Sequence, residues 1–280
     1  MKKIIVYLIF VFVFTNCKTV GVLSSGFENV KKIVPPGMIR IDDNLFYDVM
    51  EVTNIDYLEY LYWIKYVFGE DSPEYKSAYP DTSVWKKYGF EEKYFDNYKY
   101  HSFPVVGVTL EQARDYASWR ADRITEMILI EDNKIKINPN QNKDMYFSIE
   151  NYFSGKYMDY KPDVSAMYYP EIRIPVLKEY RKALDFDLKS PKKVKDYVFK
   201  PKVYMRPIKE SIPVHEFDIN AKNFQHLMGN VRELLNEGNI SVGGSWNDEA
   251  EEVLKNDIFP FDTPDAMTGF RCVASWKKWK

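Results

Sequence analysis

The sequence is poor in the residues that build metal and disulfide frameworks. Its 280 residues contain two cysteines and three histidines. Two cysteines cannot supply a cysteine-rich zinc site or a disulfide scaffold. Twelve glycines are too few for a collagen-like or flexible-linker protein. These shortages leave an ordinary globular domain as the main prediction.

The chain also lacks a basic excess and a long apolar run. Lys and Arg number 39 against 41 Asp and Glu, a formal charge of 39 − 41 = −2. Nucleic-acid-binding domains usually present a basic face, so we expect no nucleic-acid partner. The longest apolar run, Ile4–Phe14, has eleven residues, fewer than the roughly 18 needed to span a bilayer. The length allows one large domain or two small ones.

The amino terminus has the pattern of a secretory signal. Lys2 and Lys3 precede the apolar run, and Cys17 follows it closely. This arrangement resembles a bacterial lipoprotein signal, in which cleavage before the cysteine is coupled to acylation of its thiol. It predicts a signal peptide over residues 1–16, lipidation at Cys17 and a lipid-anchored tether over residues 17–36. The protein would then be anchored in the cell envelope, with the outer membrane favoured over the inner one. A plain signal peptide or an uncleaved anchor is the alternative.

Patterns of secondary structure after residue 36 indicate an irregular α+β domain over residues 37–280. A hairpin is predicted over Gly37–Val49, with its turn at Asp42–Asn44. Helices are predicted from the cap Asn54 to Gly69, after the capping box Thr109–Gln112, and from Pro175. Short strands are expected at Ile240–Ser245 and Gly269–Ala274. Residues 131–170 are polar and are interpreted as a long insertion.

Seven short motifs suggest a family. In chain order they are Glu51-Val-Thr-Asn54, Phe103-Pro-Val-Val-Gly-Val-Thr109 with Gln112-Ala113, Trp119-Arg120, Arg173-Ile-Pro175 with Glu179-Tyr180, Met228-Gly-Asn-Val-Arg-Glu233, Gly243-Gly-Ser-Trp246 and Gly269-Phe-Arg-Cys272. Their succession resembles the formylglycine-generating enzyme, or sulfatase-modifying factor, family. The resemblance covers residues 37–276 and implies a C-type-lectin-like fold, with two main helices on a small twisted sheet.

Most motif residues are expected to maintain the fold. Glycine permits turns and close backbone approach, and large aromatic side chains fill cores. Buried charges need partners, which suggests two ion pairs, Arg173 with Glu179 and Arg271 with Glu51. The glycines concerned are Gly229, Gly243, Gly244 and Gly269, and the aromatic residues are Trp119, Trp246 and Phe270.

The family's chemistry is not expected here. The resemblance implies copper-dependent oxidation at two cysteines just after the Gly-Gly-Ser segment, since thiolates suit Cu(I). Here the segment Gly243–Glu252 contains no cysteine, and Cys272 matches a cysteine that is commonly structural in the family. We therefore expect no copper and no catalytic residue. The carboxylates of this stretch predict an acidic groove instead, formed by Asp248, Glu249, Glu251, Glu252 and Asp257.

Calcium is the metal that the resemblance leaves possible here. Family members often hold calcium in a loop that corresponds to Met228–Glu233, where Asn230 and Glu233 offer oxygen donors. Arg232 and Leu234 stand where the family has tryptophan, and a loop held by hydrogen bonds alone is the alternative. His101, His215 and His226 show no ligand spacing.

These observations favour a non-catalytic envelope lipoprotein, a pseudoenzyme that binds or scaffolds a protein partner. Some lipoproteins of this family belong to gliding-motility and type IX secretion machinery, and the stretch Tyr152–Tyr169 loosely resembles theirs. The alternative is a formylglycine-generating oxidase or a related oxidoreductase. Glycan binding through the lectin-like fold is a third hypothesis, which rests on fold analogy.

Overall fold

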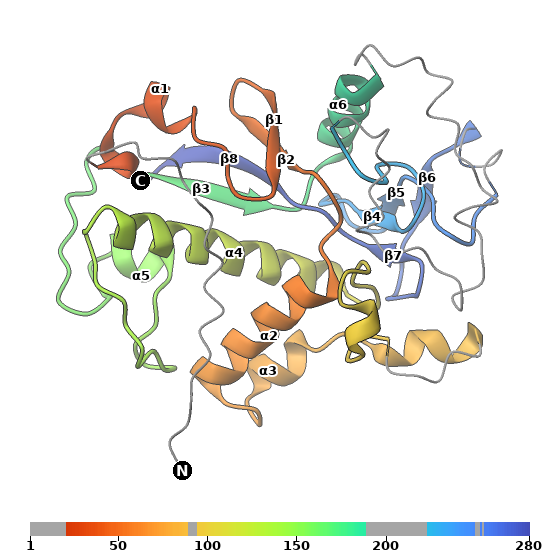
Figure 1. Cartoon of the computed structure of the whole chain (residues 1–280), viewed down its shortest axis with the longest axis horizontal. Helices are drawn as coiled ribbons and strands as arrows, with labels where there is room; N and C mark the ends of the chain where they lie inside the picture. Colours follow the sequence, from red (N-terminus) through yellow and green to blue (C-terminus); the bar gives the residue numbers. More distant parts are fainter. Residues whose placement is uncertain (1–20, 89–93, 189–222, 250–252, 254) are drawn as a thin grey trace.

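The protein is an α+β molecule with two four-stranded sheets and several helices (Figure 1). The structure, a computed structural model, describes residues 21–88, 94–188, 223–249, 253 and 255–280. The predicted signal peptide, Cys17, His215, Glu251 and Glu252 lie outside these ranges. The coarse fold class is confirmed, but the molecule has two small sheets where one was expected.

The first sheet joins distant parts of the chain in the order β1-β2-β8-β3. Strands β1 (Met38–Asp42) and β2 (Leu45–Asp48) form the predicted hairpin, with Arg40 opposite Phe46. Strand β8 (Val273–Lys278) runs antiparallel to β2 on one side and to β3 (Tyr168–Arg173) on the other. Because β8 is the last of these four strands in sequence, this sheet is complete only when the carboxyl-terminal segment has docked.

The second sheet has the order β6-β5-β4-β7 and is built from short strands. They are β4 (Arg232–Leu234), β5 (Ile240–Val242), β6 (Ile258–Pro260) and β7 (Thr268–Gly269). Strands β4 and β7 pair in parallel, and the other two pairings are antiparallel. The strand predicted over Gly269–Ala274 is therefore two strands: β7 ends in the second sheet, and β8 begins in the first.

The two longest helices begin at local capping boxes. In α4 (Leu110–Glu131), the Thr109 hydroxyl accepts the N–H of Gln112, whose side chain accepts the N–H of Thr109. In α2 (Asn54–Phe68), Thr53 and Asp56 form the same box. The cap therefore lies one residue before the predicted Asn54, whose buried amide instead donates to the Tyr100 carbonyl at 2.8 Å.

The remaining helices are shorter. The third predicted helix is α6 (Leu177–Leu188), which begins two residues after Pro175. Figure 1 shows α4 running along the first sheet, with α2 and α3 on the other side of α4. The other helical segments are 3-10 turns at Val22–Ser24, Thr82–Tyr88 and Tyr98–Tyr100, and α1 (Phe27–Val30), α3 (Pro73–Ala78) and α5 (Ile149–Phe153).

Two segments that the sequence assigned to the periphery belong to the core. In the predicted tether, Leu23 and Val30 are fully buried in the main hydrophobic cluster. The folded part therefore begins before residue 37, at least as early as Val22, whose N–H donates to Asp132 at 2.7 Å. In the predicted insertion, Phe147 and Tyr157 are also fully buried. Within the described ranges, no helix combines the length and hydropathy required to cross a bilayer.

Candidate functional site

Four of the motif residues meet in one buried cluster. The guanidinium of Arg271 donates from Nε to Glu233 Oε1 at 2.5 Å, and its Nη2 lies 3.4 Å from Glu51 Oε2. Asn230 donates from its amide to Glu51 Oε1 at 3.0 Å. The side chains of Arg271 and Glu51 have no exposed surface, and that of Glu233 has 1%. The predicted Arg271–Glu51 pair is thus present, but Glu233 is the closer partner.

Burial sets the electrostatics of this cluster. The pKa of Glu233 is raised to about 8, first by burial and then by the nearby Glu51, while Arg271 opposes the shift. The second oxygen, Glu233 Oε2, is buried without a hydrogen-bond partner among the residues that the structure describes. One arginine thus faces two carboxylates, an arrangement that holds together segments far apart in the chain.

The same cluster bears on the calcium hypothesis. Asn230 and Glu233 do lie close together, as a shared site requires. However, the cation that neutralises Glu233 is Arg271, and the Asn230 amide is turned to donate a hydrogen bond. Across the described part of the chain, no group of three or more His, Cys, Asp and Glu side chains is placed to hold a metal ion. In this arrangement Asn230 and Glu233 are engaged with Glu51 and Arg271, and calcium at this loop stays a prediction.

The thiol of Cys272 is not placed for thiolate chemistry. Cys272 is a free, fully buried cysteine. Burial is the main cause that raises its pKa, and the nearby Asp48 adds to the shift. Asp48 also accepts the Cys272 N–H at 2.8 Å. Because the only other cysteine of the sequence is Cys17, far from the Gly243–Trp246 motif in the chain, this motif has no adjacent thiol pair.

The Gly243–Trp246 segment is a tightly packed turn. Gly244 has φ +76°, and a Cβ added there would lie 2.5 Å from the side chain of Val253. At Gly269 a Cβ would meet the Val105 carbonyl oxygen at 2.6 Å. Both positions therefore require glycine. Positive φ angles are also found at Gly229 and Gly243.

The prediction of an acidic groove beside this turn is wrong for Asp248 and Asp257, two of the carboxylates assigned to it. Asp248 is 8% exposed and pairs with Arg232, whose Nε lies at 2.8 Å. Asp257 is equally buried and pairs with Arg181, at 2.5 and 2.7 Å. Each carboxylate has an arginine partner that turns it inward, since a lone buried charge is costly. Glu249 is exposed.

The other motif residues have structural contacts. Arg173 and Glu179 form the predicted ion pair through two hydrogen bonds, at 2.6 and 2.7 Å. Phe270 is fully buried. Two tryptophans that were expected in the core, Trp119 and Trp246, are only partly buried. Trp246 donates from its indole to the Ala266 carbonyl at 3.0 Å.

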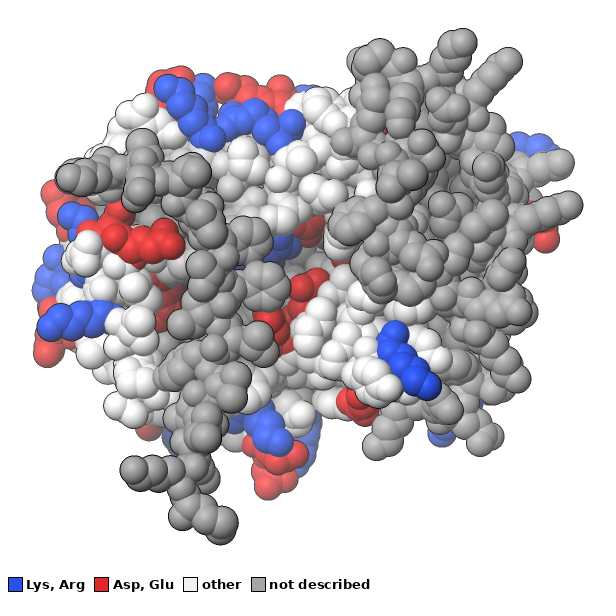
Figure 2. Space-filling view, in the orientation of Figure 1, with Lys and Arg blue, Asp and Glu red and all other residues white. Residues whose placement is uncertain are grey.

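A cleft of about 410 Å³ lies between α2, α4 and the end of β2. Figure 2 shows a hollow near the middle of the displayed face, with acidic and basic atoms inside it. The lining residues are Pro36, Gly37, Asp48, Met50, Glu51, Val52, Asp56, Glu59, Tyr116, Trp119, Arg120, Arg123, Ile124 and Met127. Sequence reasoning missed this cleft, although four of its residues, Glu51, Val52, Trp119 and Arg120, lie in two of the motifs.

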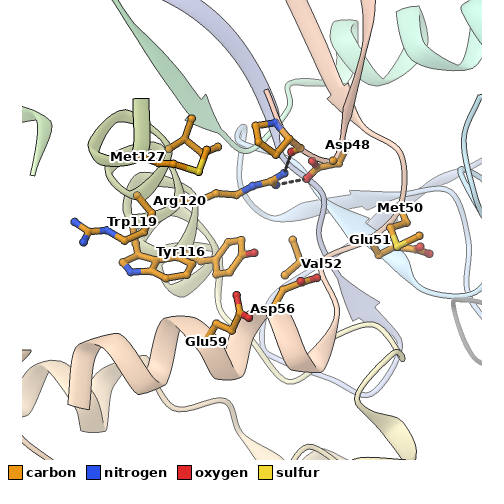
Figure 3. A pocket seen from close by; sticks show the side chains of 14 residues that line it. Asp48, Met50, Glu51, Val52, Asp56, Glu59, Tyr116, Trp119, Arg120 and Met127 are labelled. Carbon is orange, nitrogen blue, oxygen red and sulfur yellow. Dashed lines mark hydrogen bonds and ion pairs between the residues drawn. The ribbon is translucent and has the colours of Figure 1, made fainter. Parts of the chain in front are cut away.

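The two arginines of the cleft wall are already engaged, and Figure 3 shows Arg120 with its partner Asp48. Arg120 donates to Asp48 at 2.8 Å and to the Pro36 carbonyl at 2.7 Å. Arg123 donates to Glu126 and to the Phe147 carbonyl, both at 2.6 Å. Neither guanidinium therefore remains available as a free cation in the cleft.

Two carboxylates of the wall have no cationic partner among the residues that the structure describes. Asp56 accepts the Thr53 N–H in the α2 capping box, and Glu59 makes no ion pair with the described residues. Figure 3 shows Glu59 pointing from α2 towards α4. Partial burial raises the pKa of Glu59, and the neighbouring Asp56 raises it further. The cleft is therefore acidic on its α2 side, while Tyr116 and Trp119 line its α4 side.

No protein-family model matches the chain, and no curated protein matches it. Among solved structures, the chain is similar to CarF at 17% identity, with a TM-score of 0.45, over 82% of this chain and 86% of that one.

Proposed function

We propose that this protein is a non-catalytic binding domain of the sulfatase-modifying-factor type, with the C-type-lectin-like fold of that family. Support comes from the meeting of Glu51, Asn230, Glu233 and Arg271, which belong to three separate motifs, in one buried cluster. If the chain shares that fold, motif residues that are far apart in the sequence should be neighbours in space.

The observation that carries the non-catalytic assignment is the state of the thiols. The segment after Gly243–Trp246 offers no cysteine, and Cys272 is sealed in the interior with a raised pKa. Oxidation of a substrate cysteine at Cu(I) needs soft thiolate ligands beside the substrate sulfur. The carboxylates found in their place are hard donors, and Asp248 and Asp257 are bound to arginines. The domain therefore binds rather than oxidises its partner.

The setting that we propose is the cell envelope. Acylation at Cys17 would anchor the protein to a membrane, preferentially the outer one, where it would scaffold a protein partner. A place near gliding-motility or type IX secretion machinery is part of this proposal and rests on the resemblance alone.

A peptide-oxidation assay tests the assignment against the oxidase alternative. Purified full-length protein is incubated with Cu(I), oxygen and a cysteine-containing sulfatase-motif peptide, and aldehyde formation is followed by mass spectrometry. We expect no conversion. Conversion by the wild type that disappears in Cys272→Ser, with the variant still folded, would replace the binding function with an enzymatic one.

A further inference from the structure

We propose that the cleft between α2 and α4 binds an arginine or lysine side chain from an extended segment of the protein partner. This inference rests on the proposed function and names the surface that performs it. The cleft, at about 410 Å³, lies within the range of small-ligand pockets, roughly 300–1,000 Å³. Four features of its walls specify a cationic occupant.

The first feature is an uncompensated negative charge. The cleft is lined by four carboxylates and two guanidiniums. Asp48 is paired with Arg120, and Glu51 faces Arg271 behind the wall. Arg123 is paired with Glu126. Asp56, one of whose oxygens caps α2, and Glu59, one turn further on, are left with no cation from the described chain, so both can contribute negative charge to an incoming cation.

The second feature is the aromatic wall opposite these carboxylates. Tyr116 and Trp119 on α4 line the cleft, and their ring centroids lie 5.6 Å apart. Tyr116 is held from behind by stacking on Tyr57 at 5.7 Å. Trp119 is the partly exposed ring of the two, since Tyr116 is 4% exposed, and a cation over an exposed aromatic face is attracted to the ring. Carboxylates on one side and aromatic rings on the other together suit a guanidinium or an ammonium group.

The third feature is the protonation behaviour of Glu59. Its pKa is raised by burial and by Asp56, although the side chain keeps exposed surface, so ionising this carboxyl costs more in the free protein than it does in water. A bound cation would reverse the shift. Cation binding and ionisation of Glu59 are thus coupled in the direction that favours a complex.

The fourth feature indicates that the occupant belongs to a longer segment. Along α2, Ile55, Glu59, Tyr62 and Tyr66 follow one another at spacings of four, three and four residues and share a face. Ile55, Tyr62 and Tyr66 are 40%, 69% and 48% exposed. Apolar and aromatic side chains of this kind are enriched at protein interfaces. A segment lying along this face would bring one side chain to the cleft at Glu59.

The test uses a probe that isolates the cationic side chain. N-acetyl-arginine amide is titrated into full-length, isotope-labelled protein, and amide chemical shifts are recorded by NMR. N-acetyl-citrulline amide, a neutral isostere, serves as the ligand control. We expect saturable shifts confined to the cleft with arginine and none with citrulline. Equal binding of both compounds, or shifts reproduced by calcium chloride alone, would overturn the proposal.

Variants locate the binding site. Glu59→Gln removes one cleft charge and should weaken arginine binding about twofold to fivefold, as expected for a solvent-exposed ion pair. Glu131→Gln is the matched control, because Glu131 is exposed at the far end of α4, outside the cleft. Unchanged affinity in a folded Glu59→Gln variant would refute the site. A complex with an isolated envelope partner that survives Glu59→Gln would refute the site while the binding function stands, whereas aldehyde formation in the oxidation assay would refute the function itself.

Discussion

Burial changes the pKa of a charged residue in this protein more than its neighbours in sequence do. Asp122 on α4 is an instructive case. Its carboxylate accepts the N–H of Ile149 at 2.8 Å, which ties the start of α5 to α4. Burial nevertheless raises its pKa to about 6, from 3.8, although the Ile149 N–H and Arg123 favour the ionised form. The hydrogen bond only partly offsets desolvation.

This shift predicts a pH effect. Because the folded-state pKa exceeds the unfolded value, the folded protein binds the extra proton between pH 3.8 and about 6, and stability falls as the pH rises through that window. Asp122→Asn keeps an acceptor for Ile149 and abolishes the titration. We expect the variant to be more stable than the wild type at pH 7, by about 1–3 kcal/mol, with the difference vanishing below pH 4.

Urea unfolding at pH 4, 5, 6 and 7 measures the effect. Asp122→Ala, which removes both the charge and the acceptor, should be less stable than Asp122→Asn at every pH. Parallel stability profiles for wild type and Asp122→Asn would contradict the account.

Among the elements, α4 is the one whose start is most clearly specified by residues close together in the sequence. Its capping box satisfies two backbone N–H groups, and Gln112 also donates to the Ser77 and Tyr79 carbonyls at 2.8 and 2.9 Å. One end of the longest helix therefore also fixes the segment around α3. Since α4 contributes Tyr116, Trp119 and Arg120 to the cleft, the register of this helix positions one whole wall.

Removing the cap should weaken the helix measurably. Thr109→Ala deletes the oxygen that accepts the Gln112 N–H, and we expect a loss of about 1 kcal/mol in the free energy of unfolding. Thr109→Ser, which restores a hydroxyl, should recover most of it. Chemical denaturation monitored by circular dichroism provides the comparison, and an unchanged midpoint for Thr109→Ala would show that tertiary contacts alone hold this end.

At the scale of the molecule, the two ends of the described chain are packed together. Strand β8, near the carboxyl terminus, pairs with β2 of the first hairpin. The Trp276 indole donates to the Ile33 carbonyl at 3.0 Å, and Asn44 exchanges hydrogen bonds with the Trp276 backbone. Most of the segment that was expected to be a tether is therefore packed against the core. This packing would leave little free chain between a lipid at Cys17 and the folded domain.

The anchor itself is open to a direct test. Cys17→Ser should abolish incorporation of a labelled fatty acid and release the protein from membranes, because no other thiol lies near the apolar run. Cys272→Ser is the matched control and should retain the label, whatever its effect on stability. A wild-type protein that takes up no fatty acid would refute the lipoprotein prediction.

The sequence by itself determined the features that depend on a few consecutive residues. The Thr109–Gln112 box and the Asp42–Asn44 turn were readable because each signal lies within a few consecutive residues. The α+β character followed from the order of such local signals along the chain. The shortage of thiols was equally plain from composition. The cap of α2 was misplaced by one residue because Thr53 and Asn54 are both good capping residues.

Only the tertiary structure decided which charged side chains face inward and where the cleft between α2 and α4 lies. Arg232 reaches Asp248 across 16 residues, Arg181 reaches Asp257 across 76, and Arg271 takes Glu233 as its closest partner across 38. Long-range packing selects such partners, because each buried charge must find its counter-charge wherever the fold brings one. The cleft arises in the same way: Asp56, Glu59 and Tyr116 line one space only because α2 packs against α4.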